Sequence, residues 1–157
     1  MLANLAASKE IECIMPKKIL LCDDELHILR AAEFKFARAG YKVQCAADGE
    51  EAWALIEREL PDVLVTDCQM PRLNGLELAR RIKDHPATSH LPVIMLSAKG
   101  FELSADQLRE EYGISHLLGK PFSPRELFIL VEKILAGSND SGIALQPALS
   151  SAIGRWL

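Results

Sequence analysis

The sequence of 157 residues has no apolar run long enough to cross a bilayer and no block rich in lysine and arginine. A membrane-spanning helix needs about 20 consecutive apolar residues. The first fifteen residues also lack the basic start, apolar centre and cleavage site of a signal peptide. The formal net charge is -4, whereas proteins that hold a nucleic-acid backbone present clustered positive charge. We therefore expect a cytoplasmic protein with neither membrane insertion nor direct nucleic-acid binding.

Cysteine and histidine are few and are poorly spaced for metal binding. The four cysteines form no C-x-x-C pair, and no histidine has metal-ligand spacing to another histidine or to a cysteine. This pattern argues against a zinc site or a disulfide framework and favours reduced thiols. About half of the residues are hydrophobic and a quarter are charged, which is typical of a globular domain with its own core.

Short apolar runs and amphipathic stretches alternate regularly along most of the chain. The apolar runs predict buried strands at 18–22, 41–47, 62–67, 91–97 and 114–119, of which 41–47 lies at the sheet edge. Apolar residues at helical spacing predict helices at 25–39, around 52–56, around 76–82, at about 104–112 and at 124–135. Strict alternation of five strands and five helices predicts a doubly wound α/β domain with a parallel sheet. We expect one domain at 17–136, a flexible N-terminal extension at 1–16 and a C-terminal tail at 137–157 that leaves no room for a second domain.

Polar residues follow four of the predicted strands at their carboxyl ends, where open parallel sheets bind ligands. Asp23 and Asp24 follow the first strand, Asp67 ends the third, Ser97 ends the fourth and Lys120 follows the fifth. Carboxylates that crowd together repel unless one takes a proton or a cation binds. Mg²⁺ suits oxygen ligands, and beside it one carboxylate can attack phosphorus to form an acyl phosphate. The metal, an ammonium and a hydroxyl are the groups that stabilise the phosphoryl oxygens.

The order LLCDDE, VLVTDCQMPRLNG, VIMLSAKG and LLGKPF resembles the receiver domain of response regulators in two-component systems, over roughly residues 17–136. The resemblance implies a stand-alone receiver with a flavodoxin-like (βα)5 fold and strand order 2-1-3-4-5. It implies that Asp67 is the phosphoacceptor. It further implies that Asp24, with help from Asp23, holds Mg²⁺ together with Asp67 and the backbone carbonyl of Gln69.

The resemblance also implies roles for the remaining motif residues. Ser97 would hydrogen-bond the phosphoryl group, and Lys120 would pair with it, or with Asp67 before phosphorylation. The peptide bond between Lys120 and Pro121 is expected to be cis. The phosphodonor would be a sensor histidine kinase, a phosphotransfer protein or a small acyl phosphate, and the output would be binding of a downstream protein. The domain would not be an enzyme beyond its own phosphorylation and dephosphorylation.

Two features depart from the family's pattern or vary within it. Leu117 stands three residues before the lysine, where the family usually has a tyrosine or phenylalanine whose ring turns inward when the hydroxyl residue moves. This leaves open how Ser97 is coupled to the output. Gln69 and Lys99 stand two residues after Asp67 and Ser97, and we expect them to tune the lifetime of the acyl phosphate.

Two other functions remain open from the sequence. One is a Mg²⁺-dependent phosphatase with an aspartyl nucleophile, although such enzymes commonly carry the nucleophile after the first strand and have a cap domain. The other is a receiver-like interaction module that has lost phosphorylation, which Leu117 alone favours. Cys68, beside Asp67, is interpreted as an ordinary buried or half-buried thiol because no basic partner is evident.

Overall fold

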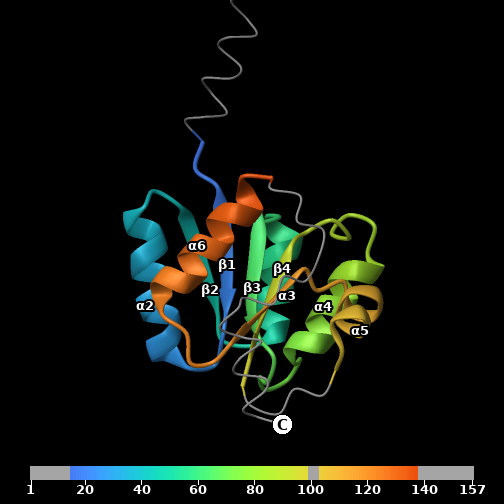
Figure 1. Ribbon diagram of the computed structural model, residues 1–157. Helices are drawn as coiled ribbons and strands as arrows, with labels where there is room; N and C mark the ends of the chain where they lie inside the picture. Colours follow the sequence, from blue (N-terminus) through green and yellow to red (C-terminus); the bar gives the residue numbers. More distant parts are fainter. Residues whose placement is uncertain (1–14, 99–102, 138–157) are drawn as a thin grey trace, which may run out of the picture.

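The structure is a computed structural model and describes residues 15–98 and 103–137. Lys99 and nearly all of the predicted extension and tail lie outside these ranges. Within them, five strands alternate with five helices (Figure 1). The strands are β1 (Lys18–Cys22), β2 (Lys42–Ala46), β3 (Val63–Asp67), β4 (Val93–Ser97) and β5 (His116–Gly119). The helices are α2 (Leu26–Arg38), α3 (Gly49–Arg58), α4 (Gly75–Asp84), α5 (Ala105–Tyr112) and α6 (Pro124–Leu135).

The five strands form one parallel sheet in the order β2-β1-β3-β4-β5. This confirms the predicted fold class and strand order, including the edge position of β2. The edge strand keeps only Ala46 fully buried, whereas every residue of β3 and β4 is buried. Strand β4 begins at Val93 rather than at residue 91, because the Leu91 N–H donates to the Thr88 carbonyl in a turn.

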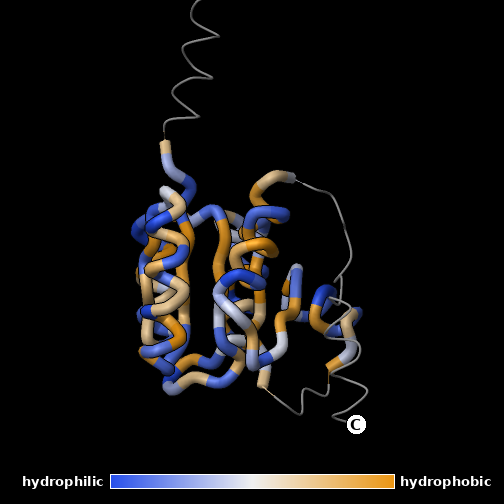
Figure 2. Tube along the Cα trace, turned by 60° about the vertical axis from the view of Figure 1, so that its left-hand side comes forward, coloured by the Kyte–Doolittle hydropathy of each residue, from blue (hydrophilic) through white to orange (hydrophobic). Residues whose placement is uncertain are grey.

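Helices cover both faces of the sheet, so the core has two layers. Helices α2 and α6 lie on one face and α3, α4 and α5 on the other (Figure 1). Alternate residues of each strand enter opposite layers, as Ile19 and Leu20 do. Figure 2 shows hydrophobic strands between helices in which hydrophobic and hydrophilic residues alternate. No helix in the described part of the chain combines the length and apolarity that crossing a membrane requires.

Local signals fix where the helices near the sheet's carboxyl edge begin. Asn74 caps α4 in a capping box with Glu77, and Ser123 caps α6 in a capping box with Glu126. Pro124 occupies the first turn of α6, where its missing N–H costs no helical hydrogen bond. These caps set the ends of the loops that follow β3 and β5, and those loops carry the candidate site.

Candidate functional site

The polar residues that follow β1, β3, β4 and β5 lie at one edge of the sheet because these parallel strands end at matching positions of the register. Cys22 pairs with Thr66, so Asp23 and Asp67 emerge side by side from β1 and β3. Ser97 pairs with Gly119, and the Lys120 N–H donates to the Ser97 carbonyl at 2.8 Å. The predicted residues of four strand ends therefore meet at this edge.

Three carboxylates gather there. Asp23, Asp24 and Asp67 each offer an oxygen, and these oxygens lie within 4.8 Å of one another. Asp23 is 1 % exposed and Asp67 is 6 % exposed, whereas Asp24 is exposed at the rim. The resemblance implies that Asp24 holds the magnesium ion with help from Asp23, and of these two acids Asp23 is the one that the fold buries. Its N–H continues the sheet by donating to the Ala46 carbonyl, and its carboxylate accepts from the Glu25 N–H at 2.9 Å.

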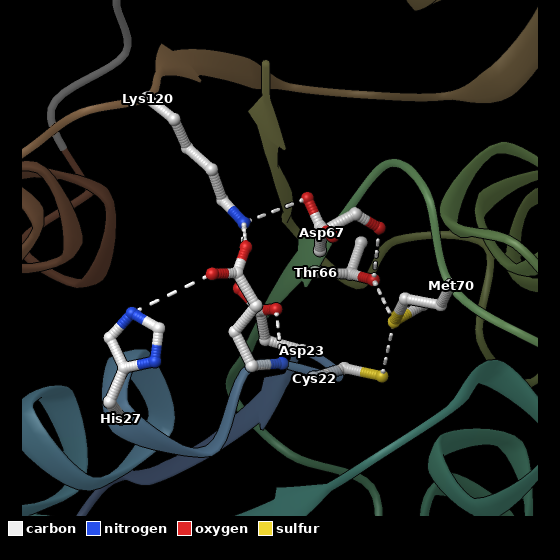
Figure 3. A network of polar contacts seen from close by, with 8 residues as sticks. Cys22, Asp23, His27, Thr66, Asp67, Met70 and Lys120 are labelled. Carbon is white, nitrogen blue, oxygen red and sulfur yellow. Dashed lines mark hydrogen bonds and ion pairs between the residues drawn. The ribbon is translucent and has the colours of Figure 1, made fainter.

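Lys120 supplies the positive charge inside this group. Its Nζ lies 3.0 Å from Asp23 Oδ2, 3.2 Å from Glu25 Oε1 and 3.2 Å from Asp67 Oδ1. Figure 3 shows the lysine reaching across the site from the end of β5 toward the carboxylates of β1 and β3. The Lys120–Pro121 peptide bond is cis, as the resemblance implies.

The charges of the site are only partly balanced. Burial raises the pKa of Asp23, against the lowering effect of its hydrogen bonds to Glu25 and Lys120. Burial, and next the charge of Asp23, raise the pKa of Asp67. Burial alone lowers the pKa of Lys120, but its bonds and attraction to the two buried aspartates outweigh this and raise the pKa to about 12. One ammonium therefore does not fully compensate the carboxylates, and a further cation would.

A hard divalent cation fits the donors that are present. All three carboxylates offer oxygen, which is the donor that Mg²⁺ prefers, and two of them are buried where unbalanced negative charge is costly. Gln69 is exposed in the loop after β3, next to this cluster in the chain.

The loop after β3 is fastened at several points. The Gly75 N–H donates to the Cys68 carbonyl at 2.9 Å, which closes the loop on itself. The Met70 sulfur lies 3.3 Å from Cys22 Sγ and 4.0 Å from Thr66 Oγ1, to one side of the carboxylates (Figure 3). The loop is therefore held against β1 and β3.

The same loop docks on the start of α3. The Gly49 N–H donates to the Leu73 carbonyl at 3.1 Å. Arg72 adopts a positive φ of 68° and pairs with Asp48 at 3.3 Å, while Asp48 caps α3. Sequence reasoning missed this pair, since nothing local in the sequence joins residues that lie 24 positions apart.

The remaining predicted residues have different surroundings. Ser97 is buried at the end of β4. Leu117 is buried in the core layer beneath α3, α4 and α5, so an aliphatic side chain fills the position where the family usually has an aromatic ring. Cys68 is half-buried, and burial together with the charge of Asp67 raises the pKa of its thiol to about 11. It is therefore a thiol of low reactivity. Lys99 lies outside the described residues.

Comparisons with known proteins agree with the fold and the motifs. The model of the response regulator receiver domain family matches residues 19–132. The alkaline phosphatase synthesis transcriptional regulatory protein PhoP of Bacillus subtilis is 40% identical over 124 residues, covering 79% of this chain and 50% of PhoP. The phosphate regulon transcriptional regulatory protein PhoB of Pseudomonas aeruginosa is 39% identical over 127 residues, covering 80% of this chain and 55% of PhoB.

Solved structures agree as well. A response regulator receiver domain protein from Clostridium thermocellum is 30% identical with a TM-score of 0.69, covering 78% of this chain and 96% of that one. The chemotaxis response regulator CheY4 of Vibrio cholerae is 28% identical with a TM-score of 0.69, covering 76% of this chain and 99% of that one. The chain spans about half the length of the curated relatives named above.

Proposed function

The chain belongs to the response regulator receiver domain family, and on that premise we propose that it is a phosphorylation switch whose phosphoacceptor is Asp67. The phosphodonor is a phosphohistidine on a sensor histidine kinase or phosphotransfer protein, or a small acyl phosphate. The observation that carries the proposal is the buried Asp67 carboxylate, which lies 3.2 Å from Lys120 within a cluster of three aspartates. The carboxylate proposed as acceptor, the two neighbouring carboxylates and the ammonium of Lys120 therefore lie together at one sheet edge.

The transfer step uses groups that the chain itself supplies. A carboxylate oxygen of Asp67 forms a bond to phosphorus while the bond from phosphorus to the donor's imidazole nitrogen, or to its acyl oxygen, breaks. The leaving group departs with the electron pair. Lys120, which pairs with Asp67 before the transfer, donates an N–H to a phosphoryl oxygen, and the hydroxyl of Ser97 donates to another. Both contacts stabilise charge on the equatorial oxygens, which is the main requirement of phosphoryl transfer.

A bound Mg²⁺ would supply further charge stabilisation to the phosphoryl oxygens. Asp23, Asp24 and Asp67 would hold it through their carboxylates, and Gln69 through its backbone carbonyl. The partial charge balance of the site supports this assignment, since the pKa values of both buried aspartates are raised. We expect Gln69 and Lys99, which flank the phosphoryl group in the family, to set how long the acyl phosphate survives.

The output is a change in protein binding. Phosphorylation changes the charge at one sheet edge and so biases a domain that has two arrangements. The domain's own chemistry is limited to its phosphorylation and dephosphorylation. PhoP and PhoB are transcriptional regulatory proteins, and by analogy the switch governs a partner or a further segment that regulates transcription. Because Leu117 is aliphatic, movement of Ser97 is coupled to this change in binding without an aromatic ring at this position.

Radiolabelled acetyl phosphate with Mg²⁺ tests the proposal. The native chain is expected to take up about one phosphoryl group per molecule, and EDTA or the substitution Asp67→Asn should abolish labelling. Asp84→Asn is the matched control, because Asp84 is an exposed aspartate at the end of α4. Labelling of Asp67→Asn equal to that of the native chain would refute the proposal. Many cycles of hydrolysis of a simple phosphate ester would favour the phosphatase instead.

A further inference from the structure

Lys120 has three carboxylate partners, and one of them has no role in the chemistry described above. An ammonium carries three N–H donors. The Nζ of Lys120 lies within 3.0–3.2 Å of three different acids, namely Asp23, Glu25 and Asp67. The contacts with Asp23 and Glu25 are hydrogen bonds and the one with Asp67 is an ion pair, so an incoming phosphoryl oxygen must compete with these acids for the ammonium.

Glu25 is the most weakly held of the three partners. Its side chain is 47 % exposed, whereas those of Asp23 and Asp67 are 1 % and 9 % exposed. Water competes for an exposed carboxylate, so its ion pair contributes less than a buried pair does. Glu25 also has a second neighbour in His27, whose Nε2 lies 3.6 Å from Oε2. The Glu25 contact is thus the one that Lys120 can give up.

The backbone of Glu25 is anchored independently of its side chain. Its N–H donates to Asp23 Oδ1, and its carbonyl accepts from the N–H groups of Ile28 and Leu29 at the start of α2. Its side chain makes no hydrogen bond that caps this helix. A neutral isostere at this position therefore leaves the loop and the helix in place.

We propose that Glu25 is a positioning residue that occupies a donor of Lys120 in the unphosphorylated domain and thereby slows phosphoryl uptake. This inference rests on the proposed function. The incoming phosphodonor is an anion, and one of its oxygens needs an N–H of Lys120. Glu25 both competes for that N–H and adds a fourth negative charge beside Asp23, Asp24 and Asp67. Releasing an exposed ion pair changes an equilibrium by about two- to fivefold.

The substitution Glu25→Gln keeps the side chain's shape and removes its charge. With acetyl phosphate and saturating Mg²⁺ at low ionic strength, it is expected to accelerate labelling of Asp67 about two- to fivefold. The gain should shrink at about 0.5 M salt, where charges are screened over a few ångströms. The rate of label loss should rise by a smaller factor, because the attacking water is neutral. The thermal midpoint should be unchanged, since the anchoring backbone bonds remain.

Glu33→Gln is the matched control, because Glu33 lies on α2, the helix that Glu25 precedes, and pairs with Arg30 away from the site. It should label at the native rate. The inference is overturned if Glu25→Gln labels no faster than the native chain, if its gain persists in high salt, or if Glu33→Gln gives the same gain. If the native chain itself labels no better than Asp67→Asn, the proposed function fails first, so the two failures are distinguishable.

Discussion

The substitution Gly75→Ala is expected to lower the stability of the fold and to displace the backbone of Asp67. Gly75 is the first residue of α4, and in a helix alanine is ordinarily better than glycine by about 1 kcal/mol. Here a Cβ would overlap the carbonyl oxygen of Asp67 and would lie 3.0 Å from the Cα of Cys68. Both neighbours are backbone, so the clash cannot be relieved by turning a side chain.

The expected cost follows from the same contacts. Overpacking of this kind typically destabilises by about 1–3 kcal/mol. Displacing the loop also weakens the hydrogen bond from Gly75 to Cys68, which is worth about 0.5–1.5 kcal/mol. After the helix-propensity gain is subtracted, we expect the free energy of unfolding to fall by about 0.5–3.5 kcal/mol. Labelling by acetyl phosphate should fall as well, because the backbone of Asp67 must shift.

Urea denaturation measures the change as a lower midpoint at an unchanged slope. The matched variant is Ala105→Gly, because Ala105 is the first residue of α5, just after its Ser104 cap. That position tolerates a Cβ, so the variant should lose at most about 1 kcal/mol. If Gly75→Ala unfolds at the native midpoint and labels at the native rate, the close approach of α4 to Asp67 does not constrain the site.

Three further predictions concern the core, the site and one tyrosine. Phe36→Ala should lower the free energy of unfolding by about 3–5 kcal/mol, because Phe36 is 0% exposed. Phe34→Ala should lower it by less than about 0.5 kcal/mol, because Phe34 is 67% exposed. Equal losses in urea denaturation would contradict the assignment of Phe36 to the buried face of α2. Asp67→Asn should raise the thermal midpoint in EDTA and remove stabilisation by Mg²⁺. The reason is that burial raises the pKa of Asp67, so the contribution of this carboxyl group to stability declines as pH rises above about 4. A lower thermal midpoint for Asp67→Asn than for the native chain in EDTA would contradict this prediction. Burial and the bond to Glu132 raise the pKa of Tyr41 to about 12. Ultraviolet titration of the native chain, compared with Tyr41→Phe, should show this pKa, and the stability that Tyr41 contributes should be lost as pH rises above about 10. A titration midpoint near 10 would refute the prediction.

Much of the fold follows from local sequence, because its determinants act over a few residues. The burial of Phe36 and the exposure of Phe34 follow from helical spacing within one stretch. Ser123 and Pro124 mark the start of α6 by satisfying or omitting the N–H groups of a first helical turn. Parallel strands separated by helices then have few possible arrangements, so the polar strand ends could be assigned to one edge.

The relative positions of side chains from different segments follow no such local rule. Adjacent acids in D-D-E are equivalent in the sequence, yet Asp23 is buried and Asp24 is exposed, because only Asp23 continues the pairing of β1 with β2. Glu25 and Lys120 are 95 positions apart, and no periodicity relates them. Their contact exists because β1 and β5 end at the same edge and both side chains reach over it.

The sequence by itself determined the order of strands and helices, the caps, and which residue types stand at the carboxyl ends of the strands. These features depend on spacing and on backbone hydrogen bonds within a few residues. Only the tertiary structure decided that Lys120 is shared among three carboxylates, that Gly75 lies against the carbonyl of Asp67, and that Arg72 pairs with Asp48. Those contacts depend on distances across the sheet, which are set by packing of the whole domain rather than by any segment of it.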